Sequence, residues 1–159
     1  MAGPIEVRQV TDMVLGIDVL RTEASLQGFR FMDRLVEDWR AGINRFDAPG
    51  ELLAGAFRLG QLVGVGGINI DRYVDNAAVG RIRHVYVALN ARRRGVASAI
   101  VRHLLAAANG RFDCVRLRTD TADGAAFYEA LGFSSCTSPS ATHAIVLRDM
   151  PPDSVRGLR

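Results

Sequence analysis

The residues best suited to chemistry lie between positions 85 and 98, in the order apolar strand, short turn, arginine-glycine loop and helix. Three arginines, Arg92 to Arg94, precede Gly95, and the small residue Ala97 follows. Backbone N–H groups in the first turn of a helix have no intrahelical partner and lie at the positive end of the helix dipole. Glycine lets an anion approach the backbone closely. This order of residues therefore predicts a phosphate-binding site at the start of a helix.

Two common phosphate-binding loops are excluded by the residues present. The nucleotide-hydrolase loop ends in Gly-Lys-Ser or Gly-Lys-Thr, and this chain contains no lysine. The dinucleotide-binding loop needs three glycines at fixed spacing after a strand, and the third is missing here. The pattern that remains is Arg/Gln-x-x-Gly-x-Gly/Ala, which Arg92, Gly95 and Ala97 satisfy.

This pattern, taken with the strand before it, resembles the acyl-CoA-binding signature of the GNAT superfamily of N-acyltransferases. Residues 121–133 strengthen the resemblance, because they read Thr-Ala-Asp-Gly-Ala-Ala-Phe-Tyr-Glu-Ala-Leu-Gly-Phe. This segment is similar to the C-terminal helix of the family and its Phe-Tyr-Glu-x-Leu-Gly-Phe ending. The two motifs occur in the family's order, separated by one helix and one strand. The resemblance extends from Glu51 to Asp149, and residues 1–50 match more loosely.

The resemblance implies that acetyl-CoA binds in a gap between two splayed central strands, opened by a bulge in the strand before the loop. Residues 80–87 would form that strand and offer backbone groups to the amides of pantetheine. The loop and the start of the helix would donate N–H groups to the pyrophosphate, each bond contributing roughly 1.5–3 kcal/mol. The residues assigned to cofactor binding are Val85, Tyr86, Val87, Arg92, Arg93, Arg94, Gly95, Val96, Ala97, Ser98 and Thr121.

Tyr128 is the candidate catalytic residue, because members of the family commonly place a tyrosine here beside the thioester sulfur. Amine attack on a thioester first requires an ammonium with a pKa near 10.4 to lose its proton, which costs about 4–5 kcal/mol at pH 7. The leaving thiolate needs less help, roughly 2 kcal/mol if its pKa is near 8.5. A phenol is protonated at neutral pH, so Tyr128 would act as the acid. Packing under the cofactor is its alternative role.

The general base is left open by the sequence. Many relatives carry a glutamate on the strand before the signature, where this chain has Arg81. His84 has a suitable ordinary pKa. Glu51, Asp71, Asp120 and a chain of water molecules to bulk solvent are the other candidates. Arg81 in the gap would favour an acceptor that carries a carboxylate or a phosphate beside its amine.

Acceptor specificity is expected to come from the helical N-terminal segment and from the loop at residues 134–142. The candidate lining residues are Arg30, Trp39, Asn69, Asp71 and Tyr73. Within the loop, Arg93 stands where glycine is frequent in the family, so one arginine side chain is expected to point away from the phosphates.

The elements that position these residues follow from the hydrophobic periodicity. Strands are predicted at 5–10, at Leu52–Arg58 and Gln61–Ile70 in a hairpin, and at 80–87, 113–119, 133–137 and 143–148. Helices are predicted within 13–42, broken near Gln27-Gly28, and at 95–109 and 123–131. The order β-αα-βββ-α-β-α-ββ predicts an α/β (α+β) fold. Its GNAT-like mixed, mainly antiparallel sheet has about seven strands, with helices on both faces.

Length and composition restrict the class of protein. The 159 residues are expected to form one N-acetyltransferase domain, 1–150, and a tail, 151–159, that begins with Pro151-Pro152. No apolar run reaches spanning length and the N-terminus lacks a signal pattern, so a cytoplasmic protein without a membrane partner is expected. Cys114 and Cys136 are predicted to be reduced and buried in strands. The histidines and cysteines lack the spacing of a metal site.

The sequence therefore predicts an acetyl-CoA-dependent N-acetyltransferase that uses no metal. Its acceptor would be a primary amine of a small molecule or an exposed amino group, attacking directly in a ternary complex. The alternative is a non-catalytic acyl-CoA-binding or sensor module, which Arg81 supports and Tyr128 opposes. Nucleic-acid binding is disfavoured, because the net charge is only +3 and aromatic residues do not alternate with the arginines. A homodimer is left open.

Overall fold

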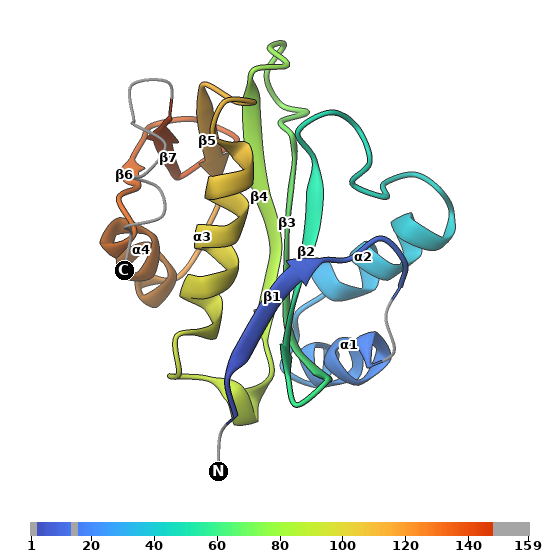
Figure 1. Cartoon of the computed structure of the whole chain (residues 1–159). Helices are drawn as coiled ribbons and strands as arrows, with labels where there is room; N and C mark the ends of the chain where they lie inside the picture. Colours follow the sequence, from blue (N-terminus) through green and yellow to red (C-terminus); the bar gives the residue numbers. More distant parts are fainter. Residues whose placement is uncertain (1–2, 14–15, 148–159) are drawn as a thin grey trace.

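The computed structural model describes residues 3–13 and 16–147, which contain one sheet and the helices that cover it (Figure 1). The strands are β1 (Ile5–Gln9), β2 (Leu52–Arg58), β3 (Gln61–Ile70), β4 (Val79–Val87), β5 (Cys114–Leu117), β6 (Ser134–Ser135) and β7 (His143–Val146). The helices are α1 (Ile17–Leu26), α2 (Phe31–Arg40), α3 (Val96–Ala108) and α4 (Ala122–Ala130), and a short 3-10 helix, η1 (Leu89–Ala91), follows β4.

The strands are ordered β1-β2-β3-β4-β5-β7-β6 across the sheet. Among the strands of the described residues, β4 and β5 form the one parallel pair, and the other neighbours are antiparallel. Helices α1 and α2 lie on one face of the sheet, and α3 and α4 lie on the other (Figure 1). The predicted mixed, mainly antiparallel sheet with helices on both faces is confirmed.

Helix α3 packs unusually close to the middle of the sheet because β3 presents glycines to it. A Cβ atom added to Gly66 would lie 2.6 Å from Cγ2 of Ile100, which is far inside van der Waals contact. Ile100, Val101, Leu104 and Leu105 on α3 are fully buried. Burial of this apolar face holds the helix, and therefore its N-terminus, in a fixed position against β3 and β4.

Two irregularities of β4 open the sheet. Val65 pairs with Tyr86 and Gly67 pairs with Arg83, so the single residue between the β3 positions faces two residues of β4. This is a β-bulge, and it bends the strand. Beyond its first three residues β4 has no partner in β5, because their pairing ends at Arg81. The two strands therefore separate toward the C-terminal end of β4.

The C-terminal strands differ most from the sequence prediction. Strand β6 has only two paired residues instead of the predicted 133–137. Cys136 follows it and is exposed, and Cys114 is half-buried in β5, so the prediction that both cysteines are buried in strands was wrong. The short edge strand leaves Cys136 outside the sheet. Pro151-Pro152 and the predicted tail lie outside the described residues. No helix in the described ranges is long and apolar enough to cross a membrane.

Candidate active site

A cavity of about 740 Å³ occupies the gap between β4 and β5. Its first wall is β4 from Ile82 to Val87, and its second is the chain from Leu117 to Thr121 together with α4. Because β5 does not pair with this part of β4, backbone N–H and C=O groups along the β4 edge lack ladder partners. Such an edge can bind an extended chain of amides by strand-like hydrogen bonds.

The helix that follows the loop begins with free backbone donors. Gly95 is the N-cap residue of α3, has a φ of 77° and provides no side-chain cap. The N–H of Ala99 reaches the carbonyl of Gly95 at 3.0 Å, so the preceding N–H groups of the first turn have no intrahelical acceptor. Ala97 in this turn lines the cavity. The predicted anion-binding geometry is therefore present at the edge of the gap.

The three arginines of the loop have different surroundings. Arg92 lines the cavity, donates its Nε–H to the carbonyl of Val87 at 2.9 Å and lies over the Tyr86 ring at 5.4 Å. Arg93 is exposed and has a φ of 62°, a left-handed conformation that costs a residue with a Cβ roughly 1–2 kcal/mol. This explains the frequent glycine at this position in the family. Arg94 lines a separate hollow of about 590 Å³ beside β1.

The structure brings together part of the set assigned from the sequence. The residues that line the cavity are Val85, Tyr86, Val87, Arg92, Ala97, Thr121 and Tyr128. Gly95 lines the hollow beside β1 with Arg94, Val96 is buried in the core, and Arg93 and Ser98 line neither of these two cavities. Thr121 is the N-cap residue of α4, where its side chain accepts a hydrogen bond from the N–H of Gly124 at 3.0 Å.

A network of side chains ties the loop to α1. Glu23 accepts hydrogen bonds from the Tyr86 hydroxyl at 2.5 Å and from the N–H of Leu89 at 2.8 Å. Gln27 donates to the Tyr86 oxygen at 2.6 Å and accepts from Arg92 at 3.4 Å. Sequence analysis assigned Tyr86 only through its backbone and missed this network, because its partners come from a distant helix without a motif.

We expect Glu23→Ala to lower the free energy of unfolding by about 1–3 kcal/mol, because two donors lose their acceptor. Urea unfolding measures this loss. Asp18→Ala is the matched control on the same helix, since Asp18 lies 3.7 Å from Arg40 in an exposed pair and should contribute at most about 1 kcal/mol. Equal losses in the two variants would contradict a role for Glu23 in holding the loop.

Tyr128 faces the cavity from α4 with a hydroxyl that makes no hydrogen bond to the described residues. Its ring packs edge-on against Phe127 and Phe133, with centroids 4.9 Å and 5.6 Å away. Burial raises the pKa of Tyr128 to about 12. The phenol therefore keeps its proton throughout the physiological range, and its O–H is available as a donor in the cavity.

His84 is not the proton acceptor that its ordinary pKa suggested. The bulge places it in a left-handed conformation, with φ of 61°, and its buried ring lies 6.4 Å from Phe31 and 6.3 Å from Phe46. Burial, followed by the nearby charge of Arg83, lowers the pKa of His84 to about 3. The imidazole is neutral at pH 7 and binds a proton poorly, so the expectation of a suitable pKa was wrong.

The His84 pKa predicts how stability depends on pH. Below pH 6.5 the unfolded chain binds a proton at this histidine that the folded chain does not bind until about pH 3. As pH decreases well below 6.5, the free energy of unfolding should therefore fall by about 1.4 kcal/mol for each pH unit because of His84. His84→Asn, which tolerates the left-handed backbone, should remove this dependence. Urea unfolding at pH 5 and pH 7 tests it, and an equal wild-type-minus-variant difference at both values would contradict it.

Two of the carboxylates considered as bases, Glu51 and Asp120, differ in whether they line the cavity. Glu51 accepts hydrogen bonds from the N–H groups of Ile70 and Ala48, at 2.9 Å and 3.3 Å, and does not line the cavity. Asp120 lines the cavity, with Arg118 Nε 3.2 Å away in an exposed pair. Asp120 and a route through water therefore stay open as proton acceptors.

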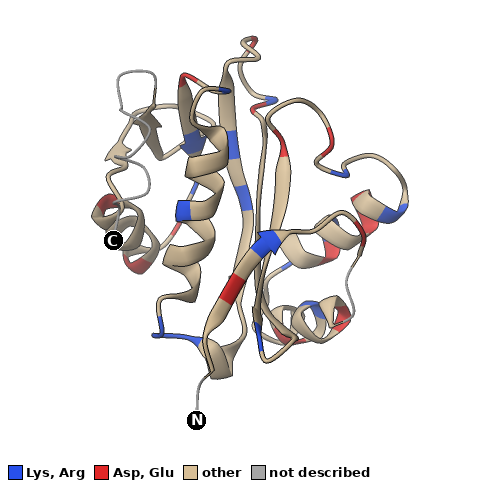
Figure 2. Ribbon diagram, in the orientation of Figure 1, with Lys and Arg blue, Asp and Glu red and all other residues tan. Residues whose placement is uncertain are grey.

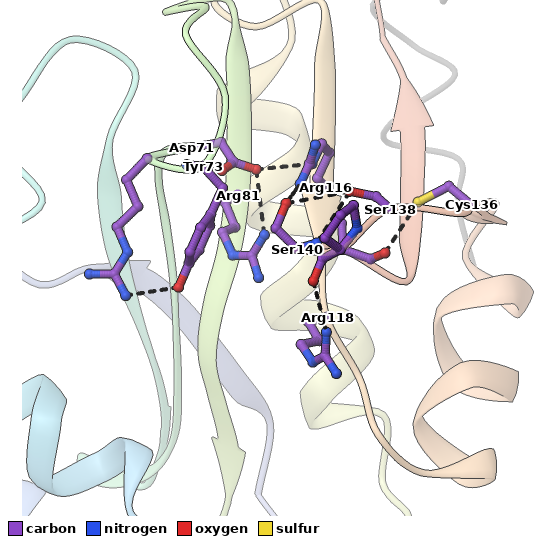
Figure 3. Close-up of polar contacts among 11 residues, drawn as sticks. Asp71, Tyr73, Arg81, Arg116, Arg118, Cys136, Ser138 and Ser140 are labelled. Atoms are coloured by element: carbon purple, nitrogen blue, oxygen red, sulfur yellow. Dashed lines mark hydrogen bonds and ion pairs between the residues drawn. The ribbon is translucent and has the colours of Figure 1, made fainter.

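Asp71 belongs to a buried cluster at the closed end of the gap (Figure 3). Its Oδ2 lies 3.5 Å from Nη1 of Arg81 and 3.1 Å from Nε of Arg116, and its side chain is fully buried. Its Oδ1 accepts the N–H of Tyr73 at 2.8 Å. Arg81 is thus held by a carboxylate that directly follows β3, and Asp71 is structural.

The residues expected to line the acceptor side of the cavity were only partly predicted. Of the five candidate lining residues, Tyr73 lines the cavity, and Arg30, Trp39, Asn69 and Asp71 do not. The residues that sequence analysis missed include Phe29, Phe31, Arg72, Arg83 and Arg118. Loop 134–142 does not line the cavity and instead supports arginines of β5 and its extension: Ser140 contacts Arg116, and the Pro139 carbonyl accepts from Arg118 at 3.5 Å. In the described residues no cluster of His, Cys, Asp or Glu could hold a metal ion.

A mainly antiparallel sheet that splits between two parallel strands, with a free helix N-terminus beside the split, defines the N-acyltransferase class of α/β folds. The chain belongs to the acetyltransferase (GNAT) family, whose sequence model matches residues 18–133. This match includes both motifs identified in the sequence, the arginine-glycine loop and the segment around Tyr128. No curated protein matches the chain at a significant level.

Solved structures show the same fold. A protein from Exiguobacterium sp. 255-15, described as a candidate acetyltransferase, is 28% identical with a TM-score of 0.81, over 90% of this chain and 93% of that one. YncA from Salmonella typhimurium, solved with its cofactor acetyl-CoA, is 12% identical with a TM-score of 0.68, over 94% and 98%. N-acetylglutamate synthase from Neisseria gonorrhoeae, complexed with coenzyme A and N-acetylglutamate, is 17% identical with a TM-score of 0.67, over 92% of this chain and 36% of that one.

Proposed function

We propose that this chain is an acetyl-CoA-dependent N-acetyltransferase that acetylates a primary amine of a small molecule or an exposed amino group, by direct attack in a ternary complex. One observation carries the proposal: the unpaired β4 edge, the free N-terminus of α3 and the Tyr128 hydroxyl border the same cavity. Membership of the family and the acetyl-CoA complex of a structural neighbour support it. A cytoplasmic location and a homodimer stay predictions from the sequence.

The residues present fit acetyl-CoA. The β4 edge at Val85, Tyr86 and Val87 would bind the amides of pantetheine, and the first N–H groups of α3 would bind the pyrophosphate. Arg92 adds positive charge beside them. When bound, acetyl-CoA supplies the acetyl group as an activated thioester.

The cavity offers a partly buried proton donor for the leaving sulfur but an exposed acceptor for the proton of the ammonium. Tyr128 holds a proton at Oη and would donate it to the leaving sulfur, because its pKa is about 12. Removing the proton from the acceptor ammonium costs about 4–5 kcal/mol at pH 7. Buried His84 lines the cavity, but its pKa of about 3 makes it a poor acceptor for this proton. Asp120 at the exposed rim, or water connected to solvent, would accept it. Transfer should therefore speed up as pH approaches the pKa of the acceptor amine.

The proposal is tested by following thiol release from acetyl-CoA with purified protein and a panel of anionic, neutral and cationic amines. We expect release that depends on the amine, with the acetylated product identified by mass spectrometry. Calorimetric titration with CoA runs in parallel. Binding of CoA without amine-dependent release for any member of the panel would count against the enzyme.

A second candidate function is a non-catalytic acyl-CoA-binding or sensor module with the same fold. The observation that favours it is Arg81, which is held by Asp71 at 3.5 Å at a position where relatives carry a carboxylate. Such a module keeps the cofactor-binding edge and loses turnover. The same pair of measurements separates the two functions, since only the enzyme releases thiol.

A further inference from the structure

Arg83 carries a half-buried positive charge in the cavity that no described carboxylate balances. It lies on β4 directly before the bulge and lines the cavity. Asn69 on β3 accepts a hydrogen bond from Arg83 Nη1 at its Oδ1 atom at 3.4 Å, and that atom already accepts from Asn44 at 3.0 Å. Burial, and then the charge of Arg72, lowers the pKa of Arg83. Its guanidinium is therefore poorly solvated and underused in hydrogen bonding.

The other arginines around this end of the cavity already have partners. Arg81 lies 3.5 Å from Asp71, and Arg118 lies 3.2 Å from Asp120. Arg72 donates to the Tyr73 hydroxyl at 2.9 Å. Among the described residues, Arg83 has no carboxylate within ion-pair distance; Asp38 on α2 affects it only at longer range.

Positive charge is in excess around Arg83. Strand β4 contains the two arginines Arg81 and Arg83. Figure 2 shows basic residues in the upper half of this strand. Asp71 is shared between Arg81 and Arg116, so one carboxylate faces two guanidinium groups before Arg83 is counted. A cavity wall with this charge balance attracts an anion, and low solvent access strengthens the attraction.

Aromatic side chains line the same cavity as Arg83. Phe29 and Phe31 contribute apolar surface to it, with ring centroids 5.6 Å apart. Tyr73 covers Arg81, whose guanidinium lies 4.6 Å from the ring centroid. An apolar wall with a few charged groups is typical of sites that orient one small ligand.

We propose that the acceptor carries a carboxylate or phosphate group besides its amine, and that Arg83, with Arg72 beside it, binds this anion. The inference rests on the proposed function and specifies its substrate class. Sequence analysis expected Arg81 to bind the anionic group of the acceptor. Because Asp71 holds Arg81, this role is assigned instead to Arg83, two positions further along β4. A guanidinium presents paired N–H donors that match the oxygens of either anion. An acceptor anchored at Arg83 keeps its amine in the cavity that Tyr128 also lines.

Paired amines test this assignment by calorimetric binding to the protein saturated with CoA. Glycine is compared with glycinamide, and phosphoethanolamine is compared with ethanolamine, so the panel separates carboxylate from phosphate recognition. We expect the member of each pair that carries an anionic group to bind more tightly. Arg83→Gln should weaken the binding of these two members roughly 10- to 100-fold and leave the binding of glycinamide and ethanolamine unchanged. Arg40→Gln, an exposed arginine on α2, is the matched control and should change neither.

Kinetics provide the second readout. Arg83→Gln should raise KM for the anionic acceptor with kcat nearly unchanged, and Arg83→Lys should recover part of the loss. Glycinamide and ethanolamine that bind as tightly as their anion-carrying partners, or tight binding of those partners that survives Arg83→Gln, would overturn the anion site. Acetylation of glycinamide or ethanolamine would still support the enzyme. Anion binding that is lost in Arg83→Gln, without thiol release for any amine, would support the site and overturn the proposed function.

Discussion

Tyr128→Phe should lower kcat for acetyl transfer by roughly 10²- to 10⁴-fold and leave the Kd for CoA nearly unchanged. The variant removes only the hydroxyl, which makes no hydrogen bond within the described part of the chain, and keeps the ring between Phe127 and Phe133. The proposed acid is lost, while the β4 edge and the start of α3 are untouched. Steady-state thiol release gives kcat, and calorimetric titration with CoA gives Kd.

Two outcomes would contradict this role for Tyr128. Unchanged kcat in Tyr128→Phe would remove the hydroxyl from the mechanism, and a parallel loss of CoA affinity would indicate that the residue packs under the cofactor instead. The pH profile adds an independent check on the wild-type protein. Because the pKa of Tyr128 is about 12, the acid stays protonated between pH 8 and pH 10, and kcat should not decline there through its ionisation.

The elements and the position of the arginine-glycine loop before α3 could be predicted because their signals are local. The β2–β3 hairpin has the predicted bounds, Leu52–Arg58 and Gln61–Ile70, since apolar runs on either side of Leu59-Gly60 leave one place for a turn. The helix start at Gly95 follows from residue spacing in the same way. Strand pairing at the C-terminus was harder, because β6 has only two residues and depends on β7 for its partner.

The environment of each side chain could not be predicted, because it depends on segments far apart in the sequence. The sequence suggests an ordinary pKa for His84, but burial of its ring beside Phe31 and Phe46, followed by the charge of Arg83, lowers that pKa and makes His84 a poor base. The sequence suggested that Arg81 could bind an anionic acceptor. In the structure its guanidinium is paired with Asp71, which directly follows β3. The sequence contains both residues, but the pairing is a consequence of the β3–β4 register.

The bulge in β4 connects these observations. It places two residues opposite Gly66 and leaves His84 in a left-handed conformation, with a buried ring that lines the cavity. Arg83 lies on one side of this irregularity and the proposed pantetheine-binding edge lies on the other. A single extra residue therefore separates the proposed acceptor end from the proposed cofactor end within one strand.

Asp71→Asn should lower the free energy of unfolding by about 3–5 kcal/mol, because it leaves Arg81 and Arg116 as neighbouring buried cations without a counter-charge. Asp71 is 1% exposed, so water cannot replace the lost carboxylate. Asparagine keeps an oxygen for the N–H of Tyr73, which Asp71 Oδ1 accepts at 2.8 Å. The substitution therefore isolates the charge, and urea unfolding measures its effect.

Asp120→Asn is the matched control for the buried cluster. Its partner Arg118 lies 3.2 Å away, but the two side chains are 76% and 51% exposed, so the loss should be at most about 1 kcal/mol. Arg116→Met in the Asp71→Asn background should restore part of the stability, since it removes one of the two unbalanced cations. Equal losses from Asp71→Asn and Asp120→Asn would mean that the cluster does not hold β4 and β5 together. The backbone hydrogen bonds between β4 and β5 alone would then hold the closed end of the cavity together.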